Sequence, residues 1–304
     1  MIQALIILSA LILGYFIDLK FLSNTLMNKL LSLMISLIIA VMGYNLGEII
    51  YKLQNELSAM LGMIVSFIIL LFCVNITAVH FYLRLSPKRA IKVHYNDVKG
   101  QRTLIPILTS CKYLLYLVIG TLLGLFIKKP LMHIEFIINA ILIATLFIIG
   151  IQMRREGHSL IQALKNKTGI MVAIILMISS LIVGVILGLI FHIPLGHSLM
   201  LTSGFGWYSL ASILNAQLIN AHFGTMTFLI DFSREIIAII IIPMLAKKIP
   251  TELVSYSGST AMDFSLPIIK DHIGIQAVTV AISSGFVLTL ATPVLIPLFN
   301  LIPF

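Results

Sequence analysis

Three charged residues lie close together in an otherwise apolar stretch of the sequence, at Asp231, Arg234 and Glu235. On a helix, residues at i, i+3 and i+4 share one face, so this spacing predicts that both carboxylates and the guanidinium lie within about one turn of each other. The group has one carboxylate more than it has cations, and a proton or a cationic ligand would neutralise it. The pattern favours proton exchange or cation binding. The structural alternative is an ion pair that locks the helix against a neighbour.

A further carboxylate, Asp263, follows Gly258 and precedes Pro267 in a segment rich in serine, so a continuous helix is not expected there. Broken helices inside a membrane place half-helix ends and free carbonyl groups where ions and charged substrates bind. We therefore expect Asp263 to contact substrate or a proton. The alternative is an N-cap for a half-helix over 264–269, with Pro267 in its first turn.

A third polar segment, 203–209, places Gly204 and Gly206 beside Trp207 and Tyr208. It has neither the third glycine nor the preceding strand of a dinucleotide-binding motif. The two aromatic rings suit either the wall of a cation path or core packing. The candidate substrate- or proton-binding residues of all three segments are Asp231, Arg234, Glu235, Asp263, Ser203, Gly204, Gly206, Trp207, Tyr208, Ser209, Ser259, Thr260 and Ser265.

Asn45 and Glu48 are weaker candidates, near the end of a predicted membrane span. For Glu48 the alternative is a solvated helix end. The two cysteines show no pairing or ligand spacing, so we expect neither a disulfide framework nor a metal site.

The composition predicts an all-α polytopic membrane protein, because 60% of the 304 residues are hydrophobic and only 10% are charged. The net charge of +9 comes from Lys and Arg in short loops, which cytoplasmic retention of positive charge explains without nucleic-acid binding. The first apolar run lacks a positive n-region and a cleavage site, so we expect a retained span rather than a signal peptide. The chain should form a single transporter domain over 1–304, with scaffold spans in 1–168 and the polar site in 169–304.

About eight spans are expected, together with two broken segments at 198–220 and 251–271. If the broken segments enter and leave the membrane on one side as re-entrant hairpins, Lys247 and Lys248 lie in the cytoplasm with the basic loops, and both termini are extracytoplasmic. The predicted spans are 2–17, 26–46, 57–83, 105–127, 134–151, 170–193, 225–246 and 275–299.

Pairs of glycines four residues apart occur at Gly43/Gly47, Gly120/Gly124 and Gly184/Gly188. Each pair lets the backbone of a neighbouring helix approach closely. We expect this packing within one chain, and a homodimer seam is the alternative.

The polar motifs resemble those of the bacterial lysine exporter family, an inner-membrane group. The resemblance rests on Ser203–Leu210, on Asp231 with Arg234–Ala238, on Ile242-Pro243 and on Thr260–Pro267. It implies export of L-lysine and of analogues such as thialysine, eight spans, and acidic membrane residues needed for transport. By motif position these are Asp231, Glu235 and Asp263, whereas Glu48 matches poorly.

The sequence therefore predicts a multi-pass secondary transporter of the bacterial inner membrane. It would export lysine by proton antiport with alternating access, without a cofactor, and its partners would be lysine, the coupling proton and membrane lipid. One alternative keeps the architecture but moves sodium or another cation against protons. A second is an intramembrane hydrolase using Ser209, which is disfavoured because that serine is in no nucleophile motif and the paired acids and arginine would have no role.

Overall fold

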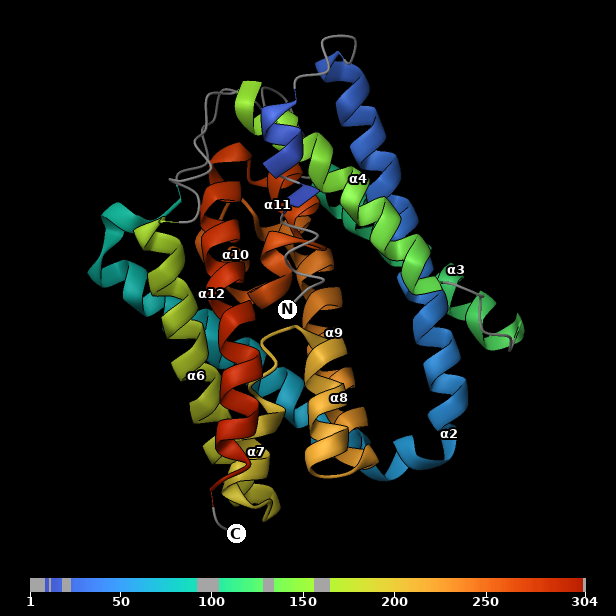
Figure 1. Cartoon of the computed structure of the whole chain (residues 1–304), viewed down its shortest axis with the longest axis vertical. Helices are drawn as coiled ribbons and strands as arrows, with labels where there is room; N and C mark the ends of the chain where they lie inside the picture. Colours follow the sequence, from blue (N-terminus) through green and yellow to red (C-terminus); the bar gives the residue numbers. More distant parts are fainter. Residues whose placement is uncertain are drawn as a thin grey trace. The chain divides into compact units, whose positions relative to one another are not determined.

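Every secondary-structure element that the computed structural model describes is helical (Figure 1). The described residues are 9–10, 12–17, 23–91, 104–127, 134–155 and 165–302. The chain forms two compact units. Unit 1 comprises Met1–Ser58 and His94–Gln162, and unit 2 comprises Ala59–Val93 and Ala163–Phe304.

Four helical stretches of the described residues are long and apolar enough to cross a membrane. They are Asn24–Glu48, Met60–Leu85, Lys167–Phe191 and Ile275–Phe299. A further helix, α9 (Ala221–Leu245), has 25 residues but carries the three charged residues Asp231, Arg234 and Glu235. An apolar, all-helical membrane protein is therefore what the sequence encodes.

The sequence predicts two separate spans at 26–46 and 57–83, but no loop divides them in the structure. Helix α2 runs through both, as Asn24–Leu85. The intervening residues are polar, but no proline or glycine lies between Glu48 and Leu61 to end the helix. At 62 residues α2 is far longer than the ~20 residues that cross a bilayer, so it holds two candidate spans in succession.

Unit 1 contains the first part of α2 together with α3 (Leu104–Ile127) and α4 (Ile134–Arg155). The glycine pair Gly43/Gly47 of α2 packs against Gly120/Gly124 of α3. A Cβ at any of the four would lie 2.1–2.3 Å from a backbone oxygen of the partner helix. The expected close packing within the chain is confirmed for these two pairs. Helix α4 runs antiparallel to α2, since Gln152 Nε2 donates to Asn28 Oδ1 at 2.9 Å and Thr145 contacts Met34.

Unit 2 is built around three 25-residue helices, α6 (Lys167–Phe191), α9 and α12 (Ile275–Phe299). They begin at residues 167, 221 and 275, so each starts 54 residues after the previous one. The side chain of Asn166 caps α6 by accepting from Gly169 N, and that of Asn220 caps α9 by accepting from Phe223 N. The Met60–Leu85 part of α2 packs on α6 and α9 through Phe67, Leu71 and their neighbours.

A broken helical segment follows α6, and another follows α9. The first is α7 (Leu195–Leu201), a non-helical break and α8 (Tyr208–Leu218). The second is α10 (Pro250–Tyr256), the 3-10 turn η3 (Gly258–Met262) and α11 (Leu266–His272). Both breaks were expected from the sequence. An Ile-Pro pair lies at the start of each first arm, and an aromatic-Ser-Leu triplet marks the start of each second arm. Unit 2 therefore repeats a long helix followed by a broken segment.

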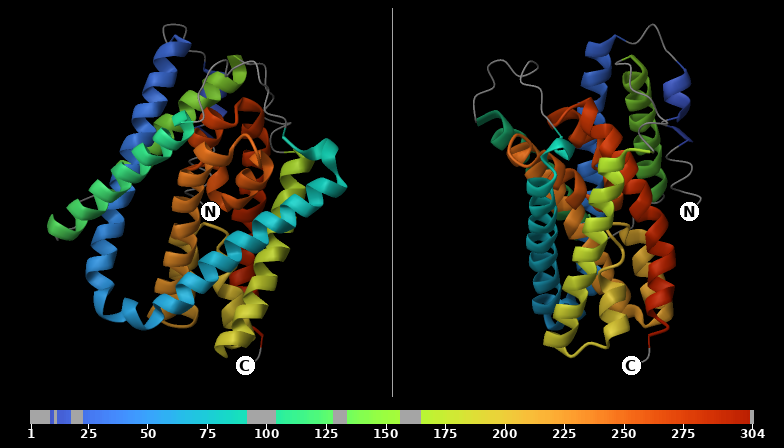
Figure 2. Two further views of the ribbon diagram at one scale, coloured as in Figure 1. Left: turned by 180° about the vertical axis from the view of Figure 1, so that it is seen from behind. Right: turned by 90° about the vertical axis from the view of Figure 1, so that its left-hand side faces the viewer.

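Each broken segment returns to the end of unit 2 from which it came, and so forms a hairpin (Figures 1 and 2). The first hairpin lies at the end of unit 2 where α6 ends and α9 begins. Helix α12 ends there too, since a Cβ at Gly196 would lie 2.5 Å from the oxygen of its last residue, Phe299. The second hairpin lies at the opposite end, where Ile91 N donates to Thr251 Oγ1 at 2.7 Å. The two hairpins therefore approach the middle of unit 2 from opposite ends.

The basic side chains described in unit 2, Arg234 apart, gather at the end where the second hairpin lies. The stretch 191–222 at the other end contains no Lys, Arg, Asp or Glu. The basic residues are Arg84, Lys88, Arg89, Lys165, Lys167, Lys247, Lys248 and Lys270. One end of the unit is thus strongly basic and the other has no such charge.

Gly47→Ala should destabilise the protein, because its Cβ would lie 2.1 Å from Thr121 O and a backbone oxygen cannot swing aside. Overpacking of this kind costs about 1–3 kcal/mol. Gly62→Ala is the matched control, since Gly62 lies on the same helix with nothing within 4 Å of its Cβ position. Thermal unfolding of the purified protein should show a lower midpoint for the first variant and an unchanged or higher midpoint for the second. Equal shifts would contradict the close crossing of α2 and α3.

Candidate functional site

The tips of the two hairpins meet through a backbone hydrogen bond. Ser259 N, at the start of η3, donates to Phe205 O in the first break at 2.8 Å. Phe205 is fully buried and packs against Ala173 and Leu176 of α6 and Leu288 of α12. Its φ of 50° is unusual for a bulky residue, so the surrounding contacts must hold the tip in this shape.

Glycines are required at this junction by geometry. Gly258 has a φ of 66°, and a Cβ there would lie 2.1 Å from Phe205 O. Gly206 has a φ of 96°. A Cβ at Gly204 would lie 1.7 Å from Asp231 Oδ2. The backbones of the two tips therefore pack against each other and against the carboxylate of Asp231.

Asp231 holds the first tip in place. Its Oδ1 accepts from Gly206 N at 2.9 Å, while its other oxygen lies against Gly204. Helix α12 also reaches both tips, since Thr292 Oγ1 donates to Gly204 O at 3.2 Å and Gly285 lies against Met262. The charged segment of α9 is thus attached directly to the hairpin junction.

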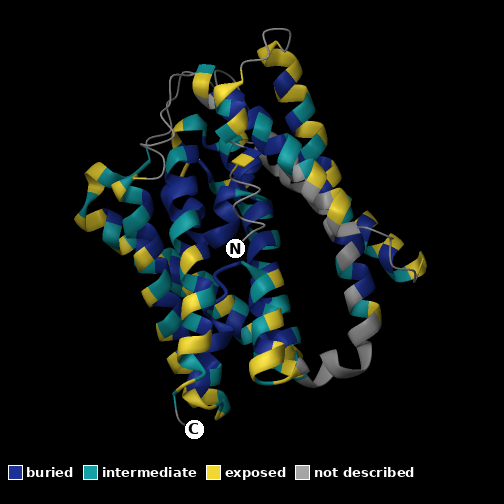
Figure 3. Ribbon diagram, viewed as in Figure 1, coloured by how far each residue is buried: buried dark blue, intermediate teal, exposed yellow. Residues whose placement is uncertain are grey.

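The three charged side chains of α9 are buried: Asp231 is 1% exposed, Arg234 2% and Glu235 0%. Figure 3 colours the buried residues of the chain dark blue. They lie at i, i+3 and i+4 of one helix, as the spacing predicts. Eleven buried side-chain nitrogen and oxygen atoms lack a hydrogen-bond partner among the described residues, and six of them belong to these three side chains. Because a buried charge without a partner is costly, this concentration marks the place where a charged ligand would be most stabilising.

Arg234 does not form the self-neutralising ion pair that was the structural alternative. Among the described residues nothing accepts a hydrogen bond from its Nε, Nη1 or Nη2. The guanidinium instead lies over the ring of Tyr256, with Cζ 5.3 Å from the ring centroid. This cation–π contact supports the cation and leaves its N–H groups available to an acceptor.

Tyr256 is the residue that sequence reasoning missed. It is 2% exposed, ends α10 and also packs edge-on against Phe72 of α2 at 5.0 Å. An aromatic residue just before the Ser257-Gly258 break was the only signal in the sequence. Arg234 and Tyr256 are 22 positions apart and lie on different elements, so their contact leaves no periodic pattern in the sequence.

Asp263 lies directly after η3 and is half-buried. Its Oδ1 accepts from its neighbour Phe264 N at 2.6 Å, and its charge interacts with that of Glu235. The alternative role as N-cap of the following half-helix is wrong, because α11 starts at Leu266 with Ser265 at the N-cap position. Asp263 thus lies close enough to Glu235 on α9 for the two negative charges to act on each other.

The hydroxyl groups of the second tip are nearby and buried. Thr260 Oγ1 donates to Ser257 O at 2.7 Å and lies 3.2 Å from Ser265 Oγ. Ser259 Oγ has no partner among the described residues. These hydroxyls supply neutral hydrogen-bonding groups beside the carboxylates.

The first hairpin contacts the buried charged group through its backbone more than through its side chains. Ser203, just after α7, donates from Oγ to Leu199 O of that helix at 2.7 Å. Tyr208 packs edge-on against Phe228 and Phe232 of α9, and Trp207 is half-buried beside it. Ser209 is exposed and does not join the buried group.

Glu48 and Asn45 belong to unit 1. The solvated helix end considered for Glu48 is wrong, because the residue is 7% exposed and α2 continues beyond it. It lies at the crossing of α2 with α3, where its backbone nitrogen would be 3.1 Å from a Cβ at Gly124. The side chain of Asn45 is outside the described residues. The part of the chain that the structure describes contains no group of three His, Cys, Asp or Glu side chains placed to hold a metal ion.

Comparison with known proteins connects this arrangement to transport. The family model described as "Lysine exporter LysO" matches residues 114–300. The Escherichia coli (strain K12) protein named "Lysine exporter LysO" is 36% identical over 297 residues, which cover 97% of this chain and 98% of that protein. A Haemophilus influenzae protein, described as a candidate lysine exporter, is 37% identical over 187 residues, which cover 61% of this chain and 95% of that protein. No solved structure matches the chain.

Gly258→Ala should damage the junction, because it combines an unfavourable φ with a Cβ 2.1 Å from Phe205 O. Gly274→Ala is the matched control, since Gly274 has a φ of 110° but nothing within 4 Å of its Cβ position. Backbone strain alone costs of order 1–3 kcal/mol at a residue held in such a conformation. The thermal midpoint should therefore fall clearly further for Gly258→Ala than for Gly274→Ala, and similar midpoints would show that the tips are not in contact.

Proposed function

The chain belongs to the lysine exporter LysO family, and from this premise we propose that it exports L-lysine, and analogues such as thialysine, from the cytoplasm by proton antiport with alternating access. The observation that carries the proposal is the buried group on α9. Arg234 and Glu235 have no hydrogen-bond partner among the described residues, and the charge of Asp263 acts on that of Glu235. Membership of the family agrees with the resemblance in the motifs.

The chemistry of lysine complements this group. Lysine carries two ammonium groups and one carboxylate. The guanidinium of Arg234 is suited to bind the carboxylate through two parallel hydrogen bonds, because its donors form a planar fork. Glu235 and Asp263 would then bind ammonium groups, and Ser259 Oγ would add a neutral contact. In this proposal Asp231 is a positioning residue, because its Oδ1 already accepts from Gly206 N.

Proton coupling follows from the excess of carboxylates. Asp231, Glu235 and Asp263 outnumber the cation Arg234. Once the ammonium of the cargo has left, a carboxylate of the empty site must be neutralised before the protein can expose the site to the other side of the low-dielectric membrane. A proton supplies that neutralisation. A carboxylate that binds either the cargo or a proton exchanges one for the other.

The same proposal extends to the membrane topology. The basic end of unit 2 would face the cytoplasm by the positive-inside rule. Both hairpins would then be re-entrant, the second from the cytoplasm and the first from outside, with eight spans and extracytoplasmic termini in the inner membrane. The whole of 1–304 would act as one transporter, with residues 1–168 as its scaffold. The hairpins, which reach the same site from opposite ends, would form the two gates of alternating access.

Counterflow of labelled L-lysine into proteoliposomes tests the cargo and the site together. The wild-type protein should take up label, and Asp263→Asn should abolish uptake because an ammonium ligand is lost. The matched control is Asp271→Asn, which removes an acid whose side chain is 60% exposed on the neighbouring α11 and should leave uptake unchanged. Equal uptake by wild type and Asp263→Asn would reduce Asp263 to a structural role. Sodium-driven rather than lysine-driven proton movement would instead support a sodium/proton antiporter.

Arg234→Lys should reduce lysine transport nearly as much as Arg234→Ala, because an ammonium cannot form the two parallel hydrogen bonds. The loss of charge-assisted hydrogen bonds is worth about 1.5–3 kcal/mol, or roughly 10-fold to 100-fold in transport. Arg89→Lys is a matched control, since Arg89 also lies over a tyrosine ring, 5.9 Å from the centroid of Tyr82, but outside the site. Initial counterflow rates measure the effect. Full activity of Arg234→Lys would remove the bidentate role.

A further inference from the structure

A pocket of about 480 Å³ lies at the basic end of unit 2, and none of the residues that line it belongs to the proposed transport site. It is lined by Ile76, Thr77, His80, Phe81 and Arg84 of α2 and by Ile249, which precedes α10. Its walls are mainly apolar, and His80 and Arg84 contribute an imidazole and a guanidinium to them. The transport mechanism proposed above does not use it.

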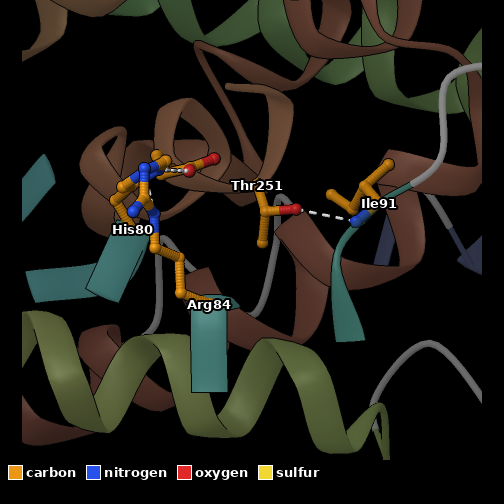
Figure 4. A network of polar contacts seen from close by, with 5 residues as sticks. His80, Arg84, Ile91 and Thr251 are labelled. Atoms are coloured by element: carbon orange, nitrogen blue, oxygen red, sulfur yellow. Dashed lines mark hydrogen bonds and ion pairs between the residues drawn. The ribbon is translucent and has the colours of Figure 1, made fainter. Parts of the chain in front are cut away.

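A chain of hydrogen bonds fixes the orientation of the guanidinium in this pocket (Figure 4). Glu252, 5% exposed, lies 2.8 Å from His80 Nδ1. Arg84 Nε donates to His80 Nε2 at 3.2 Å. Because an arginine can only donate and a carboxylate accepts, His80 must carry its proton on Nδ1 and accept on Nε2. Glu252 thus holds His80, and His80 holds Arg84 by its Nε, leaving both Nη groups to other acceptors.

The pocket lies on an outward-facing stripe of α2. Exposed residues recur at every fourth position along Met60–Leu85, and the apolar ones near the pocket are strongly exposed, with Phe81 at 65% and Leu85 at 70%. The stripe consists of Leu61, Val65, Ile69, Cys73, Thr77, Phe81 and Leu85. In a membrane protein, such an apolar stripe faces acyl chains.

The chemistry around the pocket changes abruptly at the end of this stripe. Lys247 and Lys248 immediately precede Ile249, and Arg89 follows the helix end. Glu252, which is the acidic side chain described beside the pocket, is buried and already paired with His80. An apolar wall that ends in a fixed guanidinium and a basic rim complements a molecule with an acyl chain and an anionic head group.

We propose that this pocket binds an anionic phospholipid, with the phosphate on the Nη groups of Arg84 and an acyl chain along Ile76, Phe81 and Ile249. The lipid would join the end of α2 to the start of the second hairpin, because both contribute to the pocket wall. The cargo is a weaker candidate, since the pocket opens on the apolar stripe and the guanidinium of Arg84 would repel the ammonium groups of lysine.

The test is native mass spectrometry of the full-length protein, purified in detergent and stripped of lipid, with phosphatidylglycerol or phosphatidylcholine added. The wild-type protein should bind more phosphatidylglycerol than phosphatidylcholine. Arg84→Gln should lower the fraction bound about five-fold, the value of one basic side chain at a lipid surface. Arg84→Lys keeps the charge but should still lower the fraction bound, because lysine has neither the Nε–H bond to His80 nor the planar fork. Lys167→Gln, which removes an exposed charge at the same end on another helix, should leave binding unchanged.

Three outcomes would overturn the proposal, provided that the variants keep the wild-type thermal midpoint. Wild-type binding by Arg84→Lys would mean that charge alone suffices. An equal loss in Lys167→Gln would mean a diffuse basic surface rather than a site. Displacement of the lipid by millimolar inorganic phosphate or L-lysine would assign the pocket to a free anion or to the cargo. Because lysine counterflow is measured separately, a failure here leaves the proposed transport function intact.

Discussion

The cost of burying charge controls the architecture of unit 2. A single turn of α9 carries Asp231, Arg234 and Glu235, each at most 2% exposed. One oxygen of Asp231 is satisfied by the amide of Gly206, and the cation of Arg234 is supported by the face of Tyr256. Both partners come from the hairpins rather than from neighbouring spans. The hairpins are therefore needed for the charges to be buried at all, and the remaining charged atoms define what a ligand must supply.

The sequence predicted the parts of the site that depend on local chemistry. Helical spacing alone placed the three charged residues on one face, and glycine with proline located both breaks within a few residues. The glycine pairs indicated close helix crossings, and the pair of α2 and the pair of α3 pack against each other. In each case the information lies within one turn or one segment, where steric rules act directly on neighbouring residues.

Features that depend on contacts across the fold were not predictable in this way. Tyr256 meets Arg234 only because the second hairpin folds back against α9. Asp263 lost the N-cap position to Ser265 because the 3-10 turn extends as far as Met262. Glu48 looked solvated because it follows an apolar run, yet the continuing helix and the crossing with α3 bury it. The 54-residue spacing of α6, α9 and α12 was hidden because a structural repeat requires similar helices, not similar residues.

The contact between the tips has a consequence for how such a protein can diversify. It joins main-chain atoms, Ser259 N and Phe205 O, and the glycines around it leave no space for a side chain. A side chain added at Gly204 or Gly258 would clash with this junction before it could alter selectivity. Under the proposed function, a change of cargo range, natural or designed, would act instead on the side chains that surround this backbone contact: the acids, the arginine and the serine whose hydroxyl is unpartnered among the described residues.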